Sequence, residues 1–388
     1  MRRTDRLLTL PFVLVILAEL GVCLTIGMLM PVLPVYAAGP LDAGSVGVGI
    51  AVAAVSPTAL LFQPLAGRIG DARGRRILVA TGALVVAGSV GAYTLADGLW
   101  ALVALRLVTG IGEALVFVGA ATICTDLAPV ERRGEAMSLY SLGLWGGFAV
   151  GPLVGELVLS DGRYDAVWLV AGGCALASAA IGLALPETRP ASAGAPRSNR
   201  LLHPAALRPG LVLVASVFGF AGFSAFVALY ARELGLDGAG AVFFTFSVVV
   251  VAIRTLGRRL PDRLGSRRAA GTALVLLAVG LTTIGLWSSP VGLFAGTVVF
   301  AAGQALAFPA LVTLALSGTP DAERSSVVGT FSASADVGFA IGALTLGGVA
   351  SVAGYGSVFL VCALASVAGG AVLARIPPRS PQPATSAA

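Results

Sequence analysis

Apolar stretches of near-membrane length recur along the whole chain, and this pattern constrains the fold more than any other feature. Each stretch is close to the roughly 20 residues that an α-helix needs to cross a hydrocarbon core of about 30 Å. Charged residues make up only 11% of the chain, whereas a soluble domain carries roughly 25%. Backbone groups in lipid must find partners within the protein, so these stretches are predicted to be helices.

The pattern predicts an all-α integral membrane protein with twelve transmembrane helices in two six-helix bundles. The predicted spans are 10–36, 44–66, 77–95, 99–125, 136–159, 166–185, 210–231, 241–257, 269–288, 291–317, 327–351 and 355–374. A polar segment rich in Pro, Ser and Arg divides six spans from six. The predicted domains are an N-terminal bundle over 1–185, a central cytoplasmic linker over 186–209, a C-terminal bundle over 210–376 and a short disordered tail over 377–388.

The two halves look duplicated at an offset of 191 residues. The sequence GEAL at 112–115 aligns with GQAL at 303–306, and GFAVG at 147–151 aligns with GFAIG at 338–342. Several independent matches at one offset are hard to obtain by chance. Parallel six-helix repeats are a known transporter architecture, with the substrate site near the membrane midplane between the repeats.

The arginines report the topology. Every basic residue of the chain except the single histidine is Arg, and outside the spans only Arg163 and Arg232 fall on the side opposite the termini. By the positive-inside rule both termini are cytoplasmic. The composition is typical of a GC-rich genome, so we expect a multi-pass protein of a bacterial inner membrane. The net charge of +6 reports this topology and not nucleic-acid binding, so no nucleic-acid partner is expected. The four cysteines stand singly in apolar spans, so we expect no metal, no disulfide framework and no cofactor.

The loop between spans two and three reads GRIGDARGRR, from Gly67 to Arg76. Gly67 and Gly74 are expected to permit close approach and positive φ where the chain reverses. Asp71 can accept hydrogen bonds from a helix N-terminus or pair with an arginine. Arg75 and Arg76 are expected to hold the loop at the cytoplasmic face. A related loop, GRRLPDRLGSRR, follows span eight and contains Asp262 and Gly265.

Here the chain resembles the major facilitator superfamily, whose first cytoplasmic motif the segment from Gly67 to Arg76 matches. The resemblance covers essentially the whole chain. In that family the loop is a conformational latch of the outward-open state, which implies a gating role for Asp71 and Arg75 and for the rest of the motif. The second loop, with Asp262 and Gly265, departs from the pattern by one extra residue and by Ser266 in place of an arginine.

Span five carries glycines at every fourth position: Gly143, Gly147, Gly151 and Gly155. Pro152 directly follows the third of them. Such a stripe lets a second helix approach closely, and the proline can bend its helix. Generic small-residue packing is the alternative interpretation. The pattern G-x-x-x-G-P-x-x-G resembles the span-five motif of proton-coupled drug antiporters. The stripe ends with Gly155, and Glu156 directly after it stands where the family pattern has a further, final glycine.

Two further segments resemble the twelve-span drug exporters of the same family. GMLMPVLPVY at the end of span one has prolines at the expected spacing, and Arg106 with Gly110 and Gly112 resembles the span-four motif whose arginine is linked to proton coupling. Other segments resemble a bacterial subgroup labelled arabinose-efflux-like permeases.

Ionisable residues inside the membrane cost roughly 2.5–3.5 kcal/mol each on insertion scales, so they are candidates for function. Glu19, Arg106, Glu113 and Asp336 lie within predicted spans, and we predict that they couple transport to protons. Arg254 lies nearer the cytoplasmic end of span eight and is assigned to the gate.

Arg106 and Glu113 are seven residues apart and therefore share one face of a helix. Burial favours the neutral form of Glu113, whereas Arg106 favours the carboxylate, and a carboxyl between these effects can load and release a proton. A static Glu113–Arg106 pair and direct contact of Glu113 with a cationic substrate are the alternatives. Gln304 occupies the place of Glu113 in the second half, which favours the titration role.

The predicted function is a proton-coupled exporter of small amphipathic compounds, such as drugs or natural products, that works by alternating access as a monomer. Tyr36, Phe117 and Gln304 are the predicted cavity residues beside the ionisable groups. The alternatives are an exporter of a sugar or another single metabolite, an importer, or a non-transporting membrane sensor. No enzyme activity is expected, because the chain has no P-loop, no metal cluster and no nucleophile–histidine arrangement.

Overall fold

The computed structural model describes residues 7–129, 132–159, 162–188, 203–256, 265–317, 319 and 323–376. The described residues form helices without strands. The helices of the first half are α1 (Leu10–Ala38), α2 (Gly44–Ala53), α3 (Val55–Arg73), α4 (Arg75–Gly91), the 3₁₀-helix η2 (Ala92–Leu95), α5 (Leu99–Leu127), α6 (Arg133–Val158) and α7 (Tyr164–Ala184). Those of the second half are α8 (Pro204–Glu233), α9 (Gly240–Leu256), α11 (Ser266–Leu286), α12 (Pro290–Leu316) and α13 (Arg324–Ala374).

These helices confirm the predicted fold class. Within the described residues, ten helices are long and apolar enough to cross a membrane, with α2 and α3 taken together, and α9 is a shorter apolar helix. The long helix α13 has two legs that meet at Gly354, where φ is 78° and ψ is 171°. The ten long helices, the second leg of α13 and α9 therefore account for the twelve predicted spans.

The second predicted span is divided into two helices. Helix α2 ends at Ala53 and α3 begins at Val55. Pro57 lacks the N–H that would donate to the carbonyl of Ala53, and its ring crowds that carbonyl, so a continuous helix is disfavoured here. Helix α3 then continues to Arg73, well beyond the predicted end of the span at residue 66.

Helix α8 begins at Pro204, inside the segment predicted as the central linker. The ring of His203 accepts a hydrogen bond from the backbone N–H of Ala205 at 3.3 Å, and proline suits the first helical position because its N–H is absent. The backbone N–H of His203 also donates to the hydroxyl of Thr330 at 2.9 Å. The start of α8 is thus capped and attached to α13. The rest of the predicted linker from residue 189 to 202, and the predicted tail over 377–388, lie outside the described residues.

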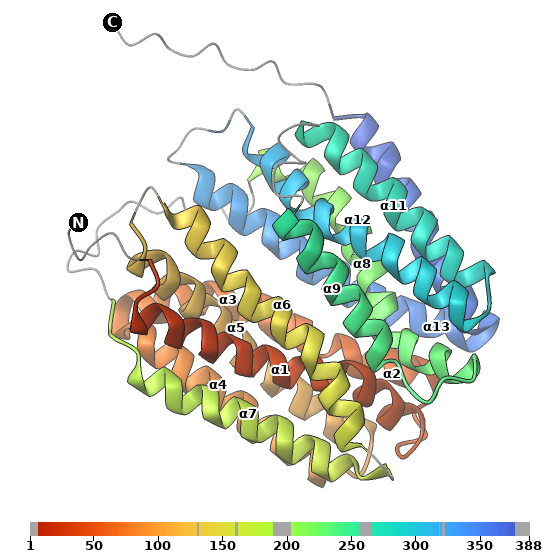
Figure 1. Ribbon diagram of the computed structural model, residues 1–388, viewed down its shortest axis with the longest axis horizontal. Coiled ribbons are helices and arrows are strands. Elements are labelled where there is room, and N and C mark those ends of the chain that lie inside the picture. Colours follow the sequence, from red (N-terminus) through yellow and green to blue (C-terminus); the bar gives the residue numbers. More distant parts are fainter. Residues whose placement is uncertain are drawn as a thin grey trace, which may run out of the picture.

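The two halves form two bundles that lie side by side (Figure 1). In the first half, the glycine stripe of α6 packs directly on the backbone of α1. A Cβ added at Gly147 would lie 2.6 Å from the carbonyl carbon of Cys23, and one added at Gly151 would lie 2.7 Å from the Cα of Gly27. In the second half, Gly338 of α13 makes the corresponding approach to Val214 of α8. The predicted close-packing role of the stripe is therefore confirmed, and the duplication has a structural counterpart.

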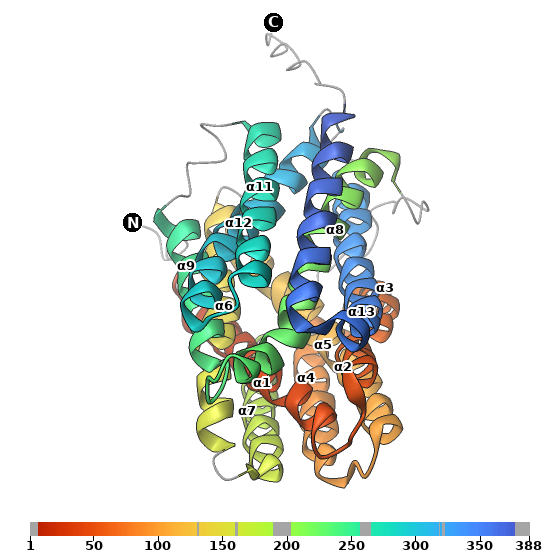
Figure 2. The same ribbon diagram turned by 90° about the vertical axis from the view of Figure 1, so that its right-hand side faces the viewer.

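We call the side at which α1 begins and α13 ends the terminal side, and the opposite side the far side. The halves are in contact at the far side along two seams, α2 with α13 and α6 with α9 (Figures 1 and 2). At the first seam Gly49 packs against the carbonyl of Ala343, and a Cβ added at Gly347 would lie 3.0 Å from the Cα of Val46. Only glycine permits such approach of two backbones.

Candidate functional site

A cavity of about 320 Å³ lies between the two halves. Helices α1, α2, α3, α5 and α6 line it from the first half, and α8 and α13 line it from the second. Its polar lining residues are Ser56, Arg106, Glu113, Ser224 and Asp336, and the remaining lining residues are apolar. Three of the four residues predicted for proton coupling therefore meet at one cavity, although they come from opposite halves of the sequence.

Arg106 is buried and donates to two backbone carbonyls at the break between α2 and α3. Its Nε lies 3.1 Å from the oxygen of Ala51, and one terminal nitrogen lies 3.3 Å from the oxygen of Val52. These carbonyls belong to the last turn of α2, where intrahelical donors are missing. A positive charge is also favourable at the carboxyl end of a helix. Arg106 thus stabilises the helix break beside the cavity.

Glu113 lies on α5 and faces the same cavity. Among the described residues its carboxylate makes no hydrogen bond and no ion pair. The alternative of a static Glu113–Arg106 pair is therefore not what the structure contains, because the guanidinium of Arg106 is engaged by carbonyls instead. Glu113 is left as an acidic group in a largely apolar enclosure.

The glycines before Glu113 set how closely α5 packs on its neighbours. Gly110 lies against the carbonyl of Val55 in α3, and a Cβ added at Gly112 would lie 2.7 Å from the oxygen of Gly82 in α4. Thr58 of α3 also donates to the carbonyl of Leu107 at 2.7 Å. This tight packing fixes the position of α5 and hence of Glu113.

Asp336 lies on α13 and is hydrogen-bonded across the interface between the halves. Its Oδ2 accepts from Nε2 of Gln63, on α3, at 3.2 Å. Gln63 was not among the predicted site residues. An isolated glutamine in an apolar span gives little signal in the sequence, because its partner lies 273 residues away.

Three phenylalanines form part of the apolar wall. Phe148 comes from α6, Phe220 from α8 and Phe339 from α13. Phe148 and Phe339 are the phenylalanines of GFAVG and GFAIG, and so they occupy equivalent positions in the duplicated halves. The repeats predicted only the glycines beside these two residues, and neither phenylalanine was among the predicted cavity residues.

Glu19 lies on α1 outside the cavity lining. It is 3% exposed, and its Oε1 accepts from the Sγ of Cys23 at 3.5 Å. Its Oε2 and the hydroxyl of Tyr140 are both buried without a hydrogen-bond partner among the described residues. Glu19 is therefore a second buried acid of the first half, in a small polar cluster separate from the cavity.

The three predicted cavity residues, Tyr36, Phe117 and Gln304, lie outside the lining of this cavity. Tyr36 donates to the carbonyl of Ala96 at 3.0 Å and packs against the rings of Tyr164 and Trp168. Phe117 is 46% exposed on the outer face of α5. Gln304 is hydrogen-bonded to Ser216 of α8 at 2.9 Å. Each side chain packs within its own half or is exposed, and the lining of the cavity does not include them.

Arg254, predicted to belong to the gate, makes a contact across the halves. Its guanidinium lies 5.0 Å from the ring centre of Trp145, on α6. This geometry is that of a cation–π interaction. The Nε of Arg254 is buried and has no partner among the described residues.

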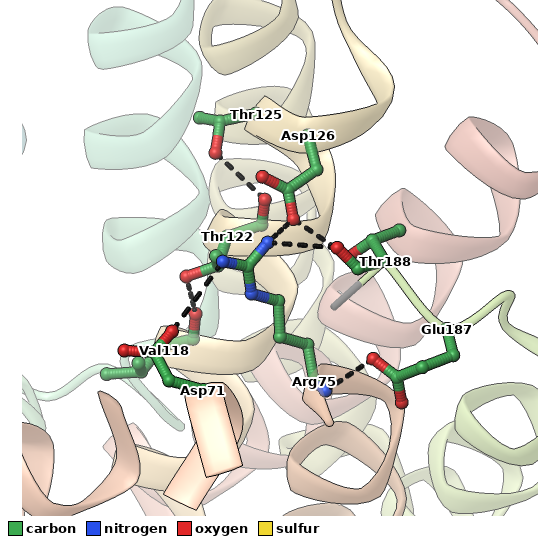
Figure 3. A network of polar contacts seen from close by, with 8 residues as sticks. All are labelled: Asp71, Arg75, Val118, Thr122, Thr125, Asp126, Glu187 and Thr188. Atoms are coloured by element: carbon green, nitrogen blue, oxygen red, sulfur yellow. Dashed lines mark hydrogen bonds and ion pairs between the residues drawn. The ribbon is translucent and has the colours of Figure 1, made fainter. Parts of the chain in front are cut away.

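The first loop motif forms a polar network at the terminal side (Figure 3). The guanidinium of Arg75 pairs with Asp126 at the end of α5 and lies 3.7 Å from Asp71. It also donates to the carbonyl of Thr188 at 3.3 Å. The backbone N–H of Arg75 donates to Glu187 at 2.8 Å. Arg75 therefore connects the turn between α3 and α4 to α5 and to the segment after α7.

The motif's glycines differ in their roles. Gly74 has φ 108° between α3 and α4, as the turn requires. Gly67 lies within α3 with open space around it, so the prediction of a close approach or positive φ is wrong there: the chain reverses at Gly74 alone. Arg76 is exposed, as expected for a residue at a membrane face.

The second loop repeats part of this arrangement. Gly265 has φ 76° before α11, like Gly74 before α4. Arg267 donates to the carbonyls of Ala374, at 2.9 Å, and of Ile376. It thereby connects the start of α11 to the chain after α13, much as Arg75 reaches the chain after α7. Asp262 lies outside the described residues.

Comparison with known proteins agrees with this architecture. The chain matches the family model described as Major Facilitator Superfamily over residues 15–256 and 210–388. An uncharacterized MFS-type transporter of Salmonella typhimurium is 29% identical over 361 residues, which cover 90% of this chain and 92% of that protein. The solved structure of the nucleoside transporter NupG has a TM-score of 0.78 at 16% identity, covering 95% of this chain and 100% of its own. That of the human organic anion transporter MFSD10 has a TM-score of 0.71 at 21% identity, covering 96% and 100%.

Proposed function

Because the chain belongs to the Major Facilitator Superfamily of membrane transporters, we propose that it is a proton-coupled exporter of small amphipathic compounds, such as drugs or natural products. The observation that carries this proposal is the pair of acids at the cavity. Glu113 from one half and Asp336 from the other line the same largely apolar space. Acids inside a membrane protein are retained against their insertion cost where they serve transport or proton transfer.

In this proposal Glu113 is the principal proton carrier. It is the cavity acid without a hydrogen-bond or ion-pair partner among the described residues, so binding a proton there breaks no existing bond of the carboxylate. Protonation of Asp336 would weaken the bond that it accepts from Gln63, because a neutral carboxyl is a poorer acceptor than a carboxylate, and this would connect its protonation to the contact between the halves. The driving force is about 2.3 kcal/mol per charge per 100 mV of membrane potential, with about 1.36 kcal/mol per pH unit in addition.

The cavity walls favour an amphipathic substrate over a sugar. Apolar and aromatic side chains such as Phe148, Phe220 and Phe339 dominate the lining. A sugar site needs many fixed hydrogen-bond partners, because each buried hydroxyl without one is costly. The donors of Arg106 described above are already used by the carbonyls of α2.

We propose further that the terminal side is cytoplasmic and that the network of Asp71, Arg75 and Asp126 takes part in gating. The positive-inside rule supports the orientation, since Arg73 and Arg76 of the first half and Arg267 and Arg268 of the second half lie at this side. A charged network that joins three separate elements is suited to hold one conformation of the loop.

Glu113→Gln tests the proposed proton role. In inside-out vesicles, this variant is expected to lose proton-driven uptake of an exported drug or dye while the protein still reaches the membrane. Gln is nearly isosteric, and the second half already carries Gln304 at the equivalent position. Glu135→Gln is the matched control, because Glu135 is exposed on α6 and pairs with Arg132. Full proton-driven uptake in Glu113→Gln would rule out Glu113 as the carrier.

A further inference from the structure

Glu156 forms a polar connection between the halves at the far side. It lies near the end of α6, and its carboxylate accepts from the backbone N–H groups of Ala239 and Gly240 at the start of α9. The bond to Gly240 is 2.7 Å long. The first N–H groups of a helix have no partners within it and carry the positive end of the helix dipole. The carboxylate therefore caps a helix that belongs to the other half.

Glycines make room for this contact. A Cβ added at Gly240 would lie 2.5 Å from Oε2 of Glu156 and 3.2 Å from the carbonyl oxygen of Pro152, and one at Gly238 would also meet the carboxylate. The start of α9 can approach α6 this closely because both positions lack side chains. The two helices lie side by side in both views (Figures 1 and 2).

The duplication shows that this contact is one-sided. At the offset of 191 residues, Glu156 aligns with Gly347, and Gly240 aligns with Gly49. The equivalent seam, between α13 and α2, is made by close approach of Gly49 to Ala343 and of Gly347 to Val46. One far-side seam is thus a backbone contact, whereas the other adds a charged cap.

We propose that Glu156 is a clasp that holds the far side closed and must release when that side opens. The inference rests on the part of the proposed function in which the halves move relative to one another, and it is independent of substrate and proton coupling. Contacts within one half persist through such a motion, whereas contacts between the halves at the far side cannot. The capping bonds of Glu156 therefore stabilise the far-side-closed state alone.

Double electron–electron resonance spectroscopy, which measures the distance between two spin labels, tests the clasp. Asp165 on α7 and Ser351 on α13 are exposed, lie at the far side and belong to different halves, so a Cys at each position reports the separation there. Cys174 is replaced by alanine in this background, because it is half-buried whereas the other native cysteines are buried. The wild type is expected to show mainly the short, closed distance.

Glu156→Gln is expected to raise the ratio of open to closed distances about tenfold, because exchanging a charged acceptor for a neutral one weakens the capping bonds by about 1.4 kcal/mol, which is a factor of ten in the ratio. Gly240→Ala is expected to shift the ratio in the same direction with the carboxylate intact, because the added methyl occupies its place. Glu233→Gln, at an exposed position at the end of α8, is the matched control and should leave the ratio unchanged.

A wild-type ratio in Glu156→Gln would overturn the clasp. If that variant does not fold, Gly240→Ala decides in the same way, since an unchanged ratio there also overturns it. The comparison of the variants with the wild type needs no substrate and no proton gradient. A wild-type protein that shows both distances but is insensitive to Glu156→Gln contradicts the clasp alone, whereas a wild type that never populates the open distance, with or without exported compounds, contradicts alternating access itself.

Discussion

Arg106 illustrates how one residue can satisfy structural and electrostatic requirements at once. Its guanidinium donates to the carbonyls of Ala51 and Val52, which would otherwise be unsatisfied groups of a helix end inside the membrane. The same side chain places a positive charge beside the cavity that Glu113 lines. The sequence resemblance implies a role in proton coupling for this arginine. The structure adds that such a role must be compatible with holding the break between α2 and α3.

The aromatic wall of the cavity gives a prediction at the residue scale. Phe148→Ala and Phe339→Ala are each expected to raise the KM for an exported aromatic compound by up to about tenfold, because a lost aromatic contact is worth roughly 0.5–1.5 kcal/mol. Phe117→Ala should leave KM unchanged, since Phe117 is exposed away from the cavity. Transport kinetics of the three variants check this. A rise in KM only for Phe117→Ala would mean that the substrate does not bind in the cavity lined by Phe148 and Phe339.

The ionisable site residues could be predicted from the sequence, but the cavity aromatics could not be chosen correctly. An acid or arginine within an apolar span is conspicuous because its burial is costly. A phenylalanine such as Phe117 or Phe148 is equally at home against lipid, in a core or in a cavity. Its role depends on how the two halves are placed, which no local pattern encodes. The same holds for the contact of Gln63 with Asp336.

At the scale of the elements, apolar runs predicted the spans because the bilayer requires helices of fixed length. The apolar run does not predict the break of the second span at Ala54, which only Pro57, three residues later, indicates. The glycine stripe of α6 was recognised because its spacing repeats, but its partner helix α1 follows only from the packed structure. Helix α8 begins before the apolar run that predicts it, because His203 caps the helix among polar residues.

The close packing of α6 against α1 within the first half gives a prediction about stability. Gly151→Ala is expected to destabilise the protein by about 1–3 kcal/mol, the usual cost of overpacking, because the added Cβ would lie 2.7 Å from the Cα of Gly27. Gly173→Ala, on the exposed face of α7 with open space around it, should be neutral or slightly stabilising. Thermal unfolding in detergent checks both variants. Equal melting temperatures for the two would contradict the close packing of α6 against α1.

At the scale of the whole molecule, different contacts act at the two sides. Glu156 and the glycine seams join the halves at the far side. At the terminal side, the network of Asp71, Arg75 and Asp126 lies within the first half and attaches the turn after α3 to the segment after α7 (Figure 3). A change in the position of α5 would therefore be transmitted to that segment and to the turn.

Asp126→Asn tests this transmission. The variant removes the charge that Arg75 pairs with, so the first turn of α4 and residues 185–188 are expected to exchange backbone hydrogens faster, and transport is expected to slow. Glu135→Gln, which alters an exposed pair with Arg132, should change neither. Hydrogen–deuterium exchange with a parallel transport assay provides both readings. Unchanged exchange in Asp126→Asn would show that the network does not hold these segments.

Exchange of substrate for protons through Glu113 can be measured with the purified protein in liposomes that enclose a pH-sensitive dye. With no gradient imposed, adding an exported compound on one side should move protons in the opposite direction in the wild type. The same addition to Glu113→Gln should move none. Transport of the compound by the wild type with no accompanying proton movement would rule out proton-coupled export.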